Sequence, residues 1–340
     1  MYISIIGKAG SGKTTFFHAL SRTPIDNKSG SSNISIIDVP DERLEKLSAF
    51  FKTKKTVHAR IELTDTPSLH SSIFQQIRQA DAFVLIIPYF EESQEDLPQA
   101  YRAVIYDFIL SDMAQVEQRL ERIAKQGGKR DNPMLQQEKE LLELCLAHLN
   151  EEKPLMSLSG IEEKMKHIRG FQFLSQKPMM IIINCSEERL SDAQDLENRF
   201  KGEIKEDIPC ITACARLEAE LSIMPEAEQA DYMAEYGIKE SIRGKIIKLA
   251  CDTLGLITFF TVGEDECRAW HIKKGETAHE AARTIHTDFY NKFIRAEVVA
   301  YDDFFKYNGF AGCKKAGAWR LEGKTYAVKD GDIITIRAGA

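Results

Sequence analysis

The chain has 340 residues, a net charge of −7 and an isoelectric point near 5.7. This length allows two or three domains, each with its own core. The acidic balance argues against a protein that coats nucleic acid or anionic lipid through bulk charge, although it leaves room for a local basic face. Seven cysteines do not suggest a disulfide framework and predict a reducing, cytoplasmic compartment. No apolar run approaches the length of a membrane helix, and the apolar start of the chain leaves no room for a signal peptide.

A glycine-rich turn follows the apolar run at residues 2–6 and precedes a helical pattern. The turn consists of Gly7, Lys8, Ala9, Gly10, Ser11, Gly12, Lys13 and Thr14, and Thr15 follows it. Strand, glycine-rich loop ending in Lys-Thr, and helix form the pattern of a phosphate-binding P-loop. Glycines let backbone N–H groups turn towards phosphate oxygens, and the helix N-terminus adds partial positive charge. Lys13 is predicted to contact the β- and γ-phosphates, and the Thr14 hydroxyl to hold Mg²⁺. The alternative is a loop that binds no nucleotide.

Two later segments stand where nucleotide switches carry magnesium ligands. Residues 23–33 are rich in Ser, Asn and Gly; Ser29, Ser31 and Ser32 could each offer a hydroxyl to Mg²⁺, and the alternative is a plain surface loop. The alternating run at 59–65 is predicted to be a strand that delivers Asp65 to its C-terminal end. Open α/β sheets bind ligands at that edge, and a carboxylate there can hold Mg²⁺ through water.

The spacing of apolar residues changes near Pro98. Apolar residues at spacings of three and four predict one seam of a long helix: Ile109, Met113, Val116, Leu120 and Ile123. Gly127-Gly128 is expected to end this helix, and Asn132-Pro133 to start a second one. The pair predicts an antiparallel helical hairpin projecting from the nucleotide domain. Its stripe is interpreted as structural core; a partner-binding arm is the alternative, with Lys125, Lys129 and Arg130 at the tip.

The continuous apolar runs at 83–88 and 177–184 are typical of parallel strands buried on both faces. The second run ends in Asn184-Cys185-Ser186-Glu187. Guanine-specific switch proteins carry Asn-Lys-x-Asp here, because an Asp carboxylate accepts both N1–H and N2–H of guanine. With Cys185 and Glu187 at the second and fourth positions, guanine selectivity is not supported. Residues 208–214 are predicted to be the last strand and the loop that flanks the base.

Several motifs resemble one family, the Obg-like ATPases of the YchF subgroup. They are Val39-Pro40-Asp41-Glu42-Arg43-Leu44, Asn184-x-x-Glu187, Cys214-Ala215-Arg216-Leu217-Glu218, Arg268-Ala269-Trp270, Ile285-His286-Thr287-Asp288-Phe289, Phe293-Ile294-Arg295-Ala296-Glu297 and Asp330-Gly331-Asp332. The resemblance covers the whole chain and is strongest at the C-terminus, where it implies a TGS module, a small ubiquitin-like β-grasp domain. Local patterns agree, with strands near 257–261, 267–272, 296–301 and 333–337 and a helix near 278–290.

The predicted fold is α/β: a G-domain-like P-loop NTPase with a parallel sheet, an inserted antiparallel helical hairpin and a C-terminal β-grasp (TGS) domain. Residues 1–97 and 173–255 are expected to form the nucleotide-binding domain, 98–172 the helical insertion and 256–340 the TGS domain. The resemblance implies slow ATP hydrolysis with ATP preferred over GTP, Mg²⁺, and association with ribosomes or translation. By position it implies that Lys13 and the loop amides hold phosphate, that Thr14 and Ser29 hold Mg²⁺, and that Asn184, Cys185 and Glu187 lie by the base. The predicted metal ligands are therefore Thr14, Ser29 and Asp65.

The chain departs from the family pattern in three places. The P-loop is usually Gly-x-Pro-Asn-Val-Gly-Lys-Ser, and Ala9, Gly10 and Ser11 replace its middle. The first-switch Thr is represented by Ser29. The second switch, usually Asp-x-x-Gly before a long glycine-rich loop, has become Asp65-Thr66-Pro67-Ser68-Leu69-His70 with that loop largely deleted. His70 is the nearest candidate for orienting the attacking water; the alternative is a surface histidine without catalytic duty.

Two functions of different classes follow. The first is a slow ATPase switch whose nucleotide state controls binding to a ribosome or an RNA-containing partner. The second is a nucleotide-dependent interaction module that has lost hydrolysis, as the shortened second switch suggests. A small-molecule phosphotransferase is a weaker third interpretation, because a second-substrate site and an arginine-rich lid are not evident.

Residues 256–340 carry 13 Lys and Arg against 12 Asp and Glu. Their net charge is therefore +1, whereas the rest of the chain has a net charge of −8, which favours the TGS domain as the part that faces a polyanion. Its candidate surface includes Lys314, Lys315 and Arg320, with an ordinary solvated face as the alternative. We expect a monomer without membrane or sequence-specific DNA partners.

Overall fold

The computed structural model describes residues 1–22, 33–90, 96–126, 133–160, 162–204, 207–238 and 240–339. The chain divides into two compact units, one of residues 1–35 with 62–246 and the other of residues 36–61 with 247–340. This division differs from the predicted domains, because residues 36–61 and 247–255 group with the C-terminal part of the chain. The first unit contains both the nucleotide-binding region and the helical insertion.

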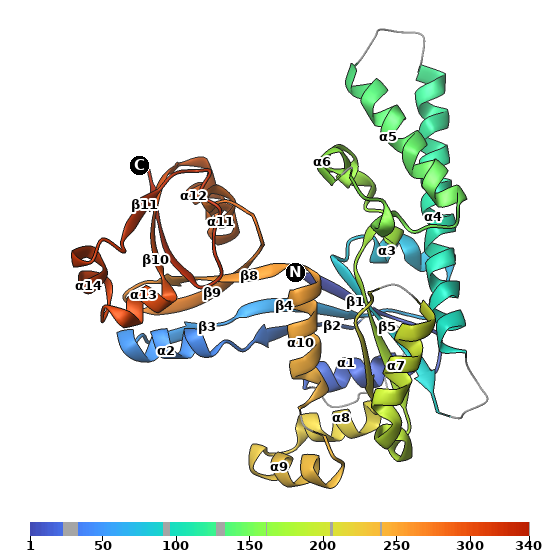
Figure 1. The fold of residues 1–340 in the computed structure, drawn as a ribbon, viewed down its shortest axis with the longest axis horizontal. Helices are drawn as coiled ribbons and strands as arrows, with labels where there is room; N and C mark the ends of the chain where they lie inside the picture. The colour runs from blue at the N-terminus through green and yellow to red at the C-terminus, as the bar shows by residue number, and fades with distance from the viewer. Residues whose placement is uncertain are drawn as a thin grey trace. The chain divides into compact units, whose positions relative to one another are not determined.

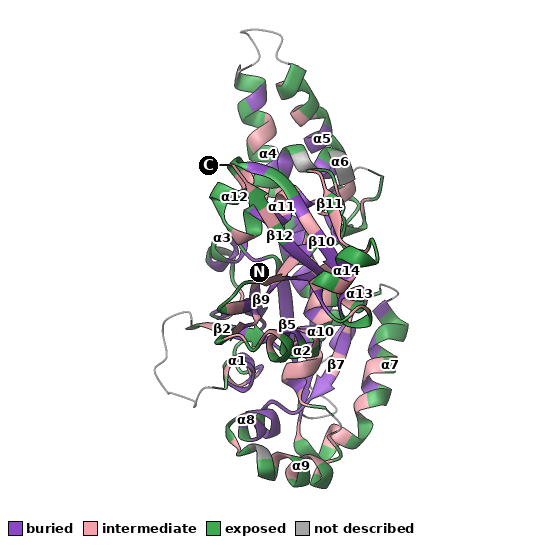
Figure 2. Cartoon of the chain, turned by 90° about the vertical axis from the view of Figure 1, so that its left-hand side faces the viewer, coloured by how far each residue is buried: buried purple, intermediate pink, exposed green. Residues whose placement is uncertain are grey.

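The first sheet has six strands in the order β2-β4-β1-β5-β6-β7 (Figure 1). Their bounds are β1 Tyr2–Ile6, β2 Asn33–Val39, β4 Ala59–Asp65, β5 Ala82–Tyr89, β6 Met179–Cys185 and β7 Cys210–Ala213. The pairs β1–β4, β1–β5, β5–β6 and β6–β7 are all parallel. Every residue of β6 is buried, and Figure 2 shows the central strand β5 buried as well. Strands covered on both faces need continuous apolar runs, so the predicted parallel sheet is confirmed.

Helices and short 3₁₀ turns connect these strands and follow the last of them. They are α1 Lys13–Ser21, η1 Ser71–Ile73, α3 Phe74–Ile77, α4 Leu97–Gln126, α5 Pro133–Asn150, η2 Leu155–Ser157, α6 Glu162–Met165, η3 Lys166–Phe171, η4 Leu174–Gln176, η5 Glu187–Asp192, α7 Ala193–Ile204, α8 Ala215–Ile223, α9 Glu226–Glu235 and α10 Ile242–Thr253. None of the helices within the described ranges combines the length and apolar character that a membrane crossing requires.

The helical hairpin is formed by α4 and α5, which lie side by side (Figure 1). Along the predicted α4 seam, Ile109, Val116 and Ile123 are buried, and Met113 and Leu120 pack against the same core. The facing residues of α5, among them Leu142, Cys145 and Leu149, are buried too. The seam is therefore structural core, as predicted. Of the residues named for the tip, Lys125 forms an ion pair with Glu121, whereas Lys129 and Arg130 lie outside the described residues.

The second sheet has the order β11-β10-β12-β8-β9-β3. The elements of this unit are α2 Glu42–Phe51, β3 Lys55–Val57, β8 Leu256–Val262, β9 Glu266–Lys273, α11 Ala278–Ile285, α12 Thr287–Asn291, β10 Phe293–Ala300, α13 Tyr301–Lys306, α14 Phe310–Lys315, β11 Arg320–Glu322 and β12 Asp332–Ala338. The β8–β9 hairpin is antiparallel, and the first strand β8 lies beside the last strand β12 in parallel. This is the order of a ubiquitin-like β-grasp domain, as predicted.

The predicted helix over residues 278–290 is two helices instead of one. The chain is extended at His286, with φ −165° and ψ 145°, and the His286 ring accepts a hydrogen bond from Asp288 N. This side-chain cap starts α12 as a separate helix, which residue periodicity alone does not reveal. Tyr301, predicted to end a strand, instead begins α13.

Residues 36–61 join the C-terminal unit for a physical reason that the sequence pattern did not show. Strand β3 pairs with β9 and so extends the β-grasp sheet by one strand. On the preceding helix α2, the rings of Phe50 and Phe51 lie 4.9 and 5.3 Å from that of Phe304. The motifs around Arg43 and Asp330 also meet here, because the Arg43 guanidinium donates to the Asp330 carboxylate at 2.5 Å. Aromatic burial and strand pairing together hold this segment in the unit.

Candidate functional site

The P-loop joins the buried strand β1 to helix α1. Gly10 and Gly12 have φ of 74° and 91°, left-handed values that favour glycine. Ser11 N donates to Lys8 O at 3.3 Å, which closes the turn, and Phe16 N donates to Gly12 O as the helix begins. The first N–H groups of α1 therefore stand at the open end of the loop, where an anion can accept from them.

Three residues predicted for the site, Lys13, Thr14 and Asp65, meet at this loop. Strand register places Ile5 of β1 opposite Asp65 of β4, which carries the Asp65 carboxylate to the P-loop end of the sheet. The Thr14 hydroxyl donates to Asp65 Oδ2 at 2.8 Å. The Lys13 ammonium donates to Lys8 O at 2.7 Å. Three residues from two distant stretches thus form one polar site.

Burial perturbs both charged groups of this site. Burial lowers the pKa of Lys13, although the charge of Asp65 opposes that shift. Burial also raises the pKa of Asp65, against the hydrogen bond from Thr14 and the charge of Lys13. Keeping either group charged therefore costs free energy unless a ligand of the opposite charge is bound. A phosphate for Lys13 and a cation for Asp65 would remove those costs.

The donor set fits a magnesium ion. Asp65 Oδ1 is buried and has no hydrogen-bond partner among the described residues. A carboxylate oxygen and a threonine hydroxyl are oxygen ligands of the kind that Mg²⁺ takes beside nucleotide phosphates. Thr14 and Asp65 would hold the ion; Ser29, the third predicted ligand, lies outside the described residues.

Asn184 braces the P-loop from the end of β6. Its Nδ2 donates to Ser11 O at 2.8 Å, and its Oδ1 accepts from Ala215 N, the first residue of α8, at 3.0 Å. The Asn184 side chain is 2% exposed. Sequence reasoning placed Asn184 by the base and missed this bridge. The signal that could have found it is the shared sheet edge at which β1 and β6 end.

Gly12→Ala tests this brace. An added Cβ would lie 2.2 Å from Asn184 Nδ2, and φ at Gly12 is 91°, so both the backbone and the brace must shift. We expect the free energy of unfolding to fall by about 1–3 kcal/mol and ATP binding to weaken at least about tenfold. Urea unfolding and equilibrium ATP titration measure the two effects.

The matched control is Gly275→Ala, because Gly275 has the same φ of 91° and no heavy atom within 4 Å of the added Cβ. It bears the backbone strain alone and lies outside the P-loop. Equal losses of ATP affinity in the two variants would show that the Asn184 brace does not matter.

The other predicted base residues lie close to Asn184 in sequence but differ in exposure. Cys185 is buried, and burial raises the pKa of its thiol to about 12, so it is a neutral apolar group at neutral pH. Glu187 is exposed at the start of η5. The Glu187 carboxylate raises the pKa of the neighbouring Tyr236 hydroxyl. Tyr236 was not predicted, and nothing in its local sequence marks it.

The second switch leaves β4 directly after Asp65. Thr66 N donates to Ile5 O at 3.2 Å, which keeps the first residue of the segment against β1. Ser68 is half-buried. His70 is exposed, and its Nδ1 lies 2.7 Å from Ser72 Oγ. A role for His70 at the attacking water therefore stays a prediction.

Helix α8, which Asn184 caps, also carries a buried carboxylate, Glu218. It is 7% exposed and accepts a hydrogen bond from Ile242 N at 2.9 Å. Burial raises its pKa from 4.5 to about 7, against that hydrogen bond and the charge of Lys245. The folded state therefore binds this proton more tightly than the unfolded state does. The resulting stability is fully present below pH 4.5 and is lost as the pH rises through about 7.

We therefore expect Glu218→Gln to remove a pH dependence of the free energy of unfolding. Relative to this variant, the natural chain should lose about 3 kcal/mol between about pH 4.5 and pH 8. Glutamine can still accept from Ile242 N and carries no charge. Urea unfolding at several pH values measures the difference, and parallel stability curves for the two proteins would contradict the expectation.

The parallel sheet, the P-loop with Lys13, Thr14 and Asp65, and the β-grasp unit together define a P-loop NTPase with a C-terminal domain. A family model, YchF-GTPase_C, described as a protein of unknown function (DUF933), matches residues 256–339. The ribosome-binding ATPase YchF of Bacillus subtilis is 35% identical over 98% of each chain. The chain belongs to the YchF family of Obg-like ATPases.

Two further similarities extend over nearly the whole chain. The Obg-like ATPase 1 of Oryza sativa is 32% identical and is matched over 98% of this chain and 90% of its own length. The structure of the Schizosaccharomyces pombe YchF GTPase aligns with a TM-score of 0.84 at 25% identity, covering 99% of this chain and 97% of that one. The names of these relatives differ in the nucleotide, since two are called ATPases and one a GTPase.

Proposed function

We propose that this chain is a magnesium-dependent ATP-binding switch that hydrolyses ATP slowly and associates with ribosomes. The observation that supports it most is the contact between the Thr14 hydroxyl and Asp65 Oδ2, at 2.8 Å, beside Lys13. This contact gathers the two predicted metal ligands at a P-loop. Ribosome association is proposed because bacterial relatives are named ribosome-binding ATPases, and it would place the protein in the cytoplasm.

ATP is proposed over GTP from the chemistry of the base motif. An Asp at the fourth position would accept from two guanine donors, and this chain has the longer Glu187 there. Cys185 is buried and neutral, in the place where guanine-specific proteins have a lysine. This pair therefore lacks the Asp and Lys with which guanine-specific proteins select guanine, and adenine lacks the N1–H and N2–H donors that such an Asp accepts from.

In this mechanism the chain's residues bind and orient the triphosphate. Backbone N–H groups of the P-loop and of the first turn of α1 donate to phosphate oxygens, and Lys13 supplies a full positive charge. Thr14 and Asp65 would hold Mg²⁺, which would neutralise charge that develops on the phosphates. Asn184 holds the loop in the conformation that exposes those N–H groups. Positioning and electrostatics account for most phosphoryl-transfer catalysis, and a chain without an assured water-orienting residue is expected to turn over slowly.

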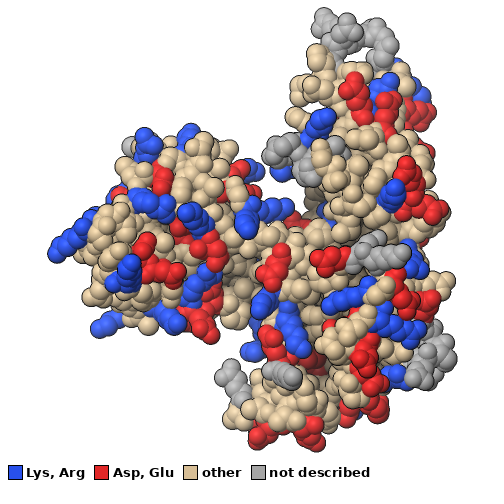
Figure 3. Space-filling model, viewed as in Figure 1, with Lys and Arg blue, Asp and Glu red and all other residues tan. Residues whose placement is uncertain are grey.

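The shortened second switch favours a second candidate, a nucleotide-dependent interaction module without hydrolysis. His70 is exposed and lies beside Ser72, which does not place it for a role at the attacking water. Figure 3 shows Lys and Arg side chains interspersed with carboxylates on the C-terminal unit. An RNA-containing partner is proposed for either candidate because residues 256–340 carry a net charge of +1 against −8 for the rest.

Single-turnover phosphate release from ATP and from GTP, with and without Mg²⁺, tests the proposal. Release from ATP that requires Mg²⁺ supports the ATPase switch, and tight binding without release supports the interaction module. Purified ribosomes sedimented with the protein in the presence of ATP or ADP test the association. A folded chain that binds neither nucleotide at millimolar Mg²⁺ would contradict both candidates.

A further inference from the structure

The first unit buries an ion pair that the nucleotide site does not use. Arg78, the C-cap residue that follows α3, is 4% exposed, and Asp112 in the middle of α4 is 0% exposed. Arg78 Nη1 donates to Asp112 Oδ1 at 2.7 Å, and Arg78 Nη2 donates to Ser111 Oγ at 2.8 Å. The helix after the second switch is thereby tied to the long helix of the hairpin.

A third segment joins the same pair. Asp112 Oδ1 also accepts from Leu174 N at 3.0 Å, and Asp112 Oδ2 accepts from Ser175 N and Ser175 Oγ, each at 2.8 Å. Arg78 Nη1 additionally donates to Gln172 O at 3.3 Å. Both carboxylate oxygens are therefore satisfied by donors from α3 and from the chain that returns from the hairpin.

These three segments have distinct places in the nucleotide unit. The first comes directly from Asp65 through a short stretch, residues 66–77. The second is the hairpin helix α4. The third is η4, which is followed two residues later by β6, and the penultimate residue of β6 is the P-loop brace Asn184. Figure 1 shows α3 beside α4 at the base of the hairpin. The pair thus lies where the second switch, the hairpin and the bracing strand meet.

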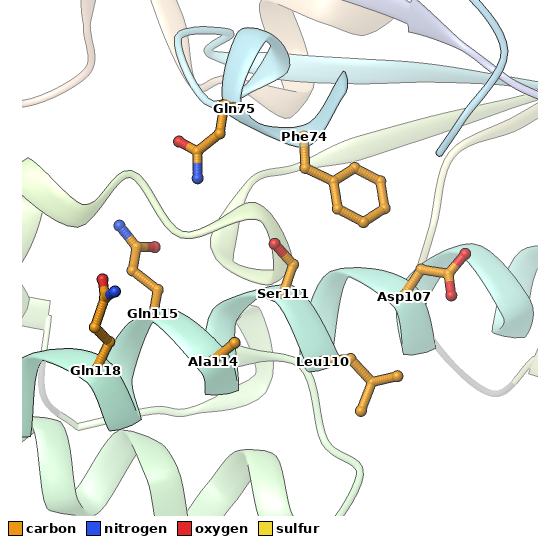
Figure 4. A pocket seen from close by; sticks show the side chains of 8 residues that line it. All are labelled: Phe74, Gln75, Asp107, Leu110, Ser111, Ala114, Gln115 and Gln118. Atoms are coloured by element: carbon orange, nitrogen blue, oxygen red, sulfur yellow. The ribbon is translucent and has the colours of Figure 1, made fainter. Parts of the chain in front are cut away.

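The pair adjoins a cleft through Ser111, which Arg78 contacts. A cleft of about 500 Å³ lies between α3 and α4, with Phe74 and Gln75 on one side and Ser111 and Gln115 among the residues of the other (Figure 4). Beside it, Arg78 Nε and Gln115 Oε1 are buried and have no partner within the described part of the chain. A buried polar group without a partner loses a hydrogen bond that it makes with water, so hydrogen-bonding capacity is left unused next to this cleft.

We propose that Arg78 is a positioning residue. Through its buried pair with Asp112, it couples nucleotide binding at the Asp65 end of the second switch to the hairpin root, which is residues 107–118 of α4 and residues 172–176. This inference rests on the proposed nucleotide switch. A buried pair adds little net stability over apolar packing, but it does select one arrangement of the segments that it joins. Movement of α3 on ATP binding pulls Arg78 and hence the hairpin root with it.

Hydrogen exchange of the full chain, read by mass spectrometry, tests the coupling. In the natural chain, saturating ATP with Mg²⁺ should change exchange in peptides covering residues 107–118 and 172–176 by about tenfold. Arg78→Lys keeps the charge but loses the fork of donors. It should retain ATP affinity within about threefold and reduce the ATP effect at the root to less than about twofold. A merely structural role of Arg78 would raise exchange equally with and without ATP.

The matched control is Arg119→Lys. Arg119 donates to both oxygens of Glu138 across the hairpin, at 2.7 and 2.8 Å, away from α3. The Arg119→Lys variant should show the full change in hydrogen exchange on ATP binding at the hairpin root. If Arg78→Lys does not fold, Ser111→Ala removes one acceptor of Arg78 and should reduce the ATP effect by about threefold.

The outcomes separate this inference from the proposed function. A natural chain that binds ATP without a change at the hairpin root overturns the coupling alone. So does an Arg78→Lys protein that responds as the natural chain does. A natural chain that binds no ATP overturns the proposed function and the coupling with it.

Discussion

Replacing Lys13 with alanine is expected to weaken ATP binding at least about a hundredfold and to abolish phosphate release, because charge-assisted hydrogen bonds to phosphate contribute about 1.5–3 kcal/mol each. Lys13 is 7% exposed, and burial lowers its pKa, so its ammonium is a poorly hydrated charge that gains strongly from an anion. The backbone N–H groups of the P-loop remain in the variant, and they cannot supply a full charge.

The same substitution should leave the fold intact. The Thr14 hydroxyl still donates to Asp65, and the desolvation of the Lys13 ammonium disappears with the side chain. Equilibrium titration with ATP and Mg²⁺, together with urea unfolding, measures binding and stability separately. Lys139→Ala is the matched control, because Lys139 pairs with Glu143 on the hairpin at 3.6 Å and is 43% exposed. An unchanged ATP affinity in Lys13→Ala would remove the basis of the proposed function.

Asp112→Ala is expected to have the largest effect on stability, a loss of about 3–5 kcal/mol in the free energy of unfolding. The substitution leaves the Arg78 guanidinium buried without its counter-charge. It also removes the acceptor of Leu174 N, Ser175 N and Ser175 Oγ. Buried donors without partners carry the full cost of desolvation, so the loss exceeds that of an ordinary polar substitution.

Urea unfolding of the first unit, followed by the signal of its helices, measures this loss. The matched control is Glu138→Ala, which removes the partner of Arg119 on the same helix pair. Glu138 and Arg119 are 21% and 31% exposed, so water can replace the lost contact. We expect a loss below about 1 kcal/mol there. Similar losses in the two variants would show that burial of the Arg78–Asp112 pair is not decisive.

Much of the site could be predicted because its signals are local. The P-loop needs glycines, a lysine and a hydroxyl at set spacings, and all lie within Gly7 to Thr14. Asp65 could be placed because a carboxylate at the end of a strand in an α/β sheet meets the ligand edge. The hairpin followed from apolar residues at spacings of three and four, which indicate one helical face whatever the rest of the chain does.

The parts that were not predicted depend on contacts between distant residues. Asn184 bridges Ser11 and Ala215, and neither partner is recognisable from the residues around Asn184. The Arg78–Asp112 pair joins residues 34 apart, with a further partner at Ser175. Short-range sequence patterns do not indicate which buried polar groups contact each other in the folded chain.

The amino-acid sequence by itself determined the P-loop pattern, the parallel sheet and the helical hairpin, because local periodicity and turn chemistry specify each of them. The β-grasp domain was expected from the family resemblance of its motifs, with which the local strand and helix patterns agree. Only the tertiary structure decided that residues 36–61 belong to the C-terminal unit, where β3 pairs with β9 and Phe50 and Phe51 pack on Phe304. It alone also decided that α3, α4 and the chain before β6 meet at Asp112. Strand pairing and burial of a charge are satisfied by whichever partners the whole fold brings together, so no stretch of sequence specifies them alone.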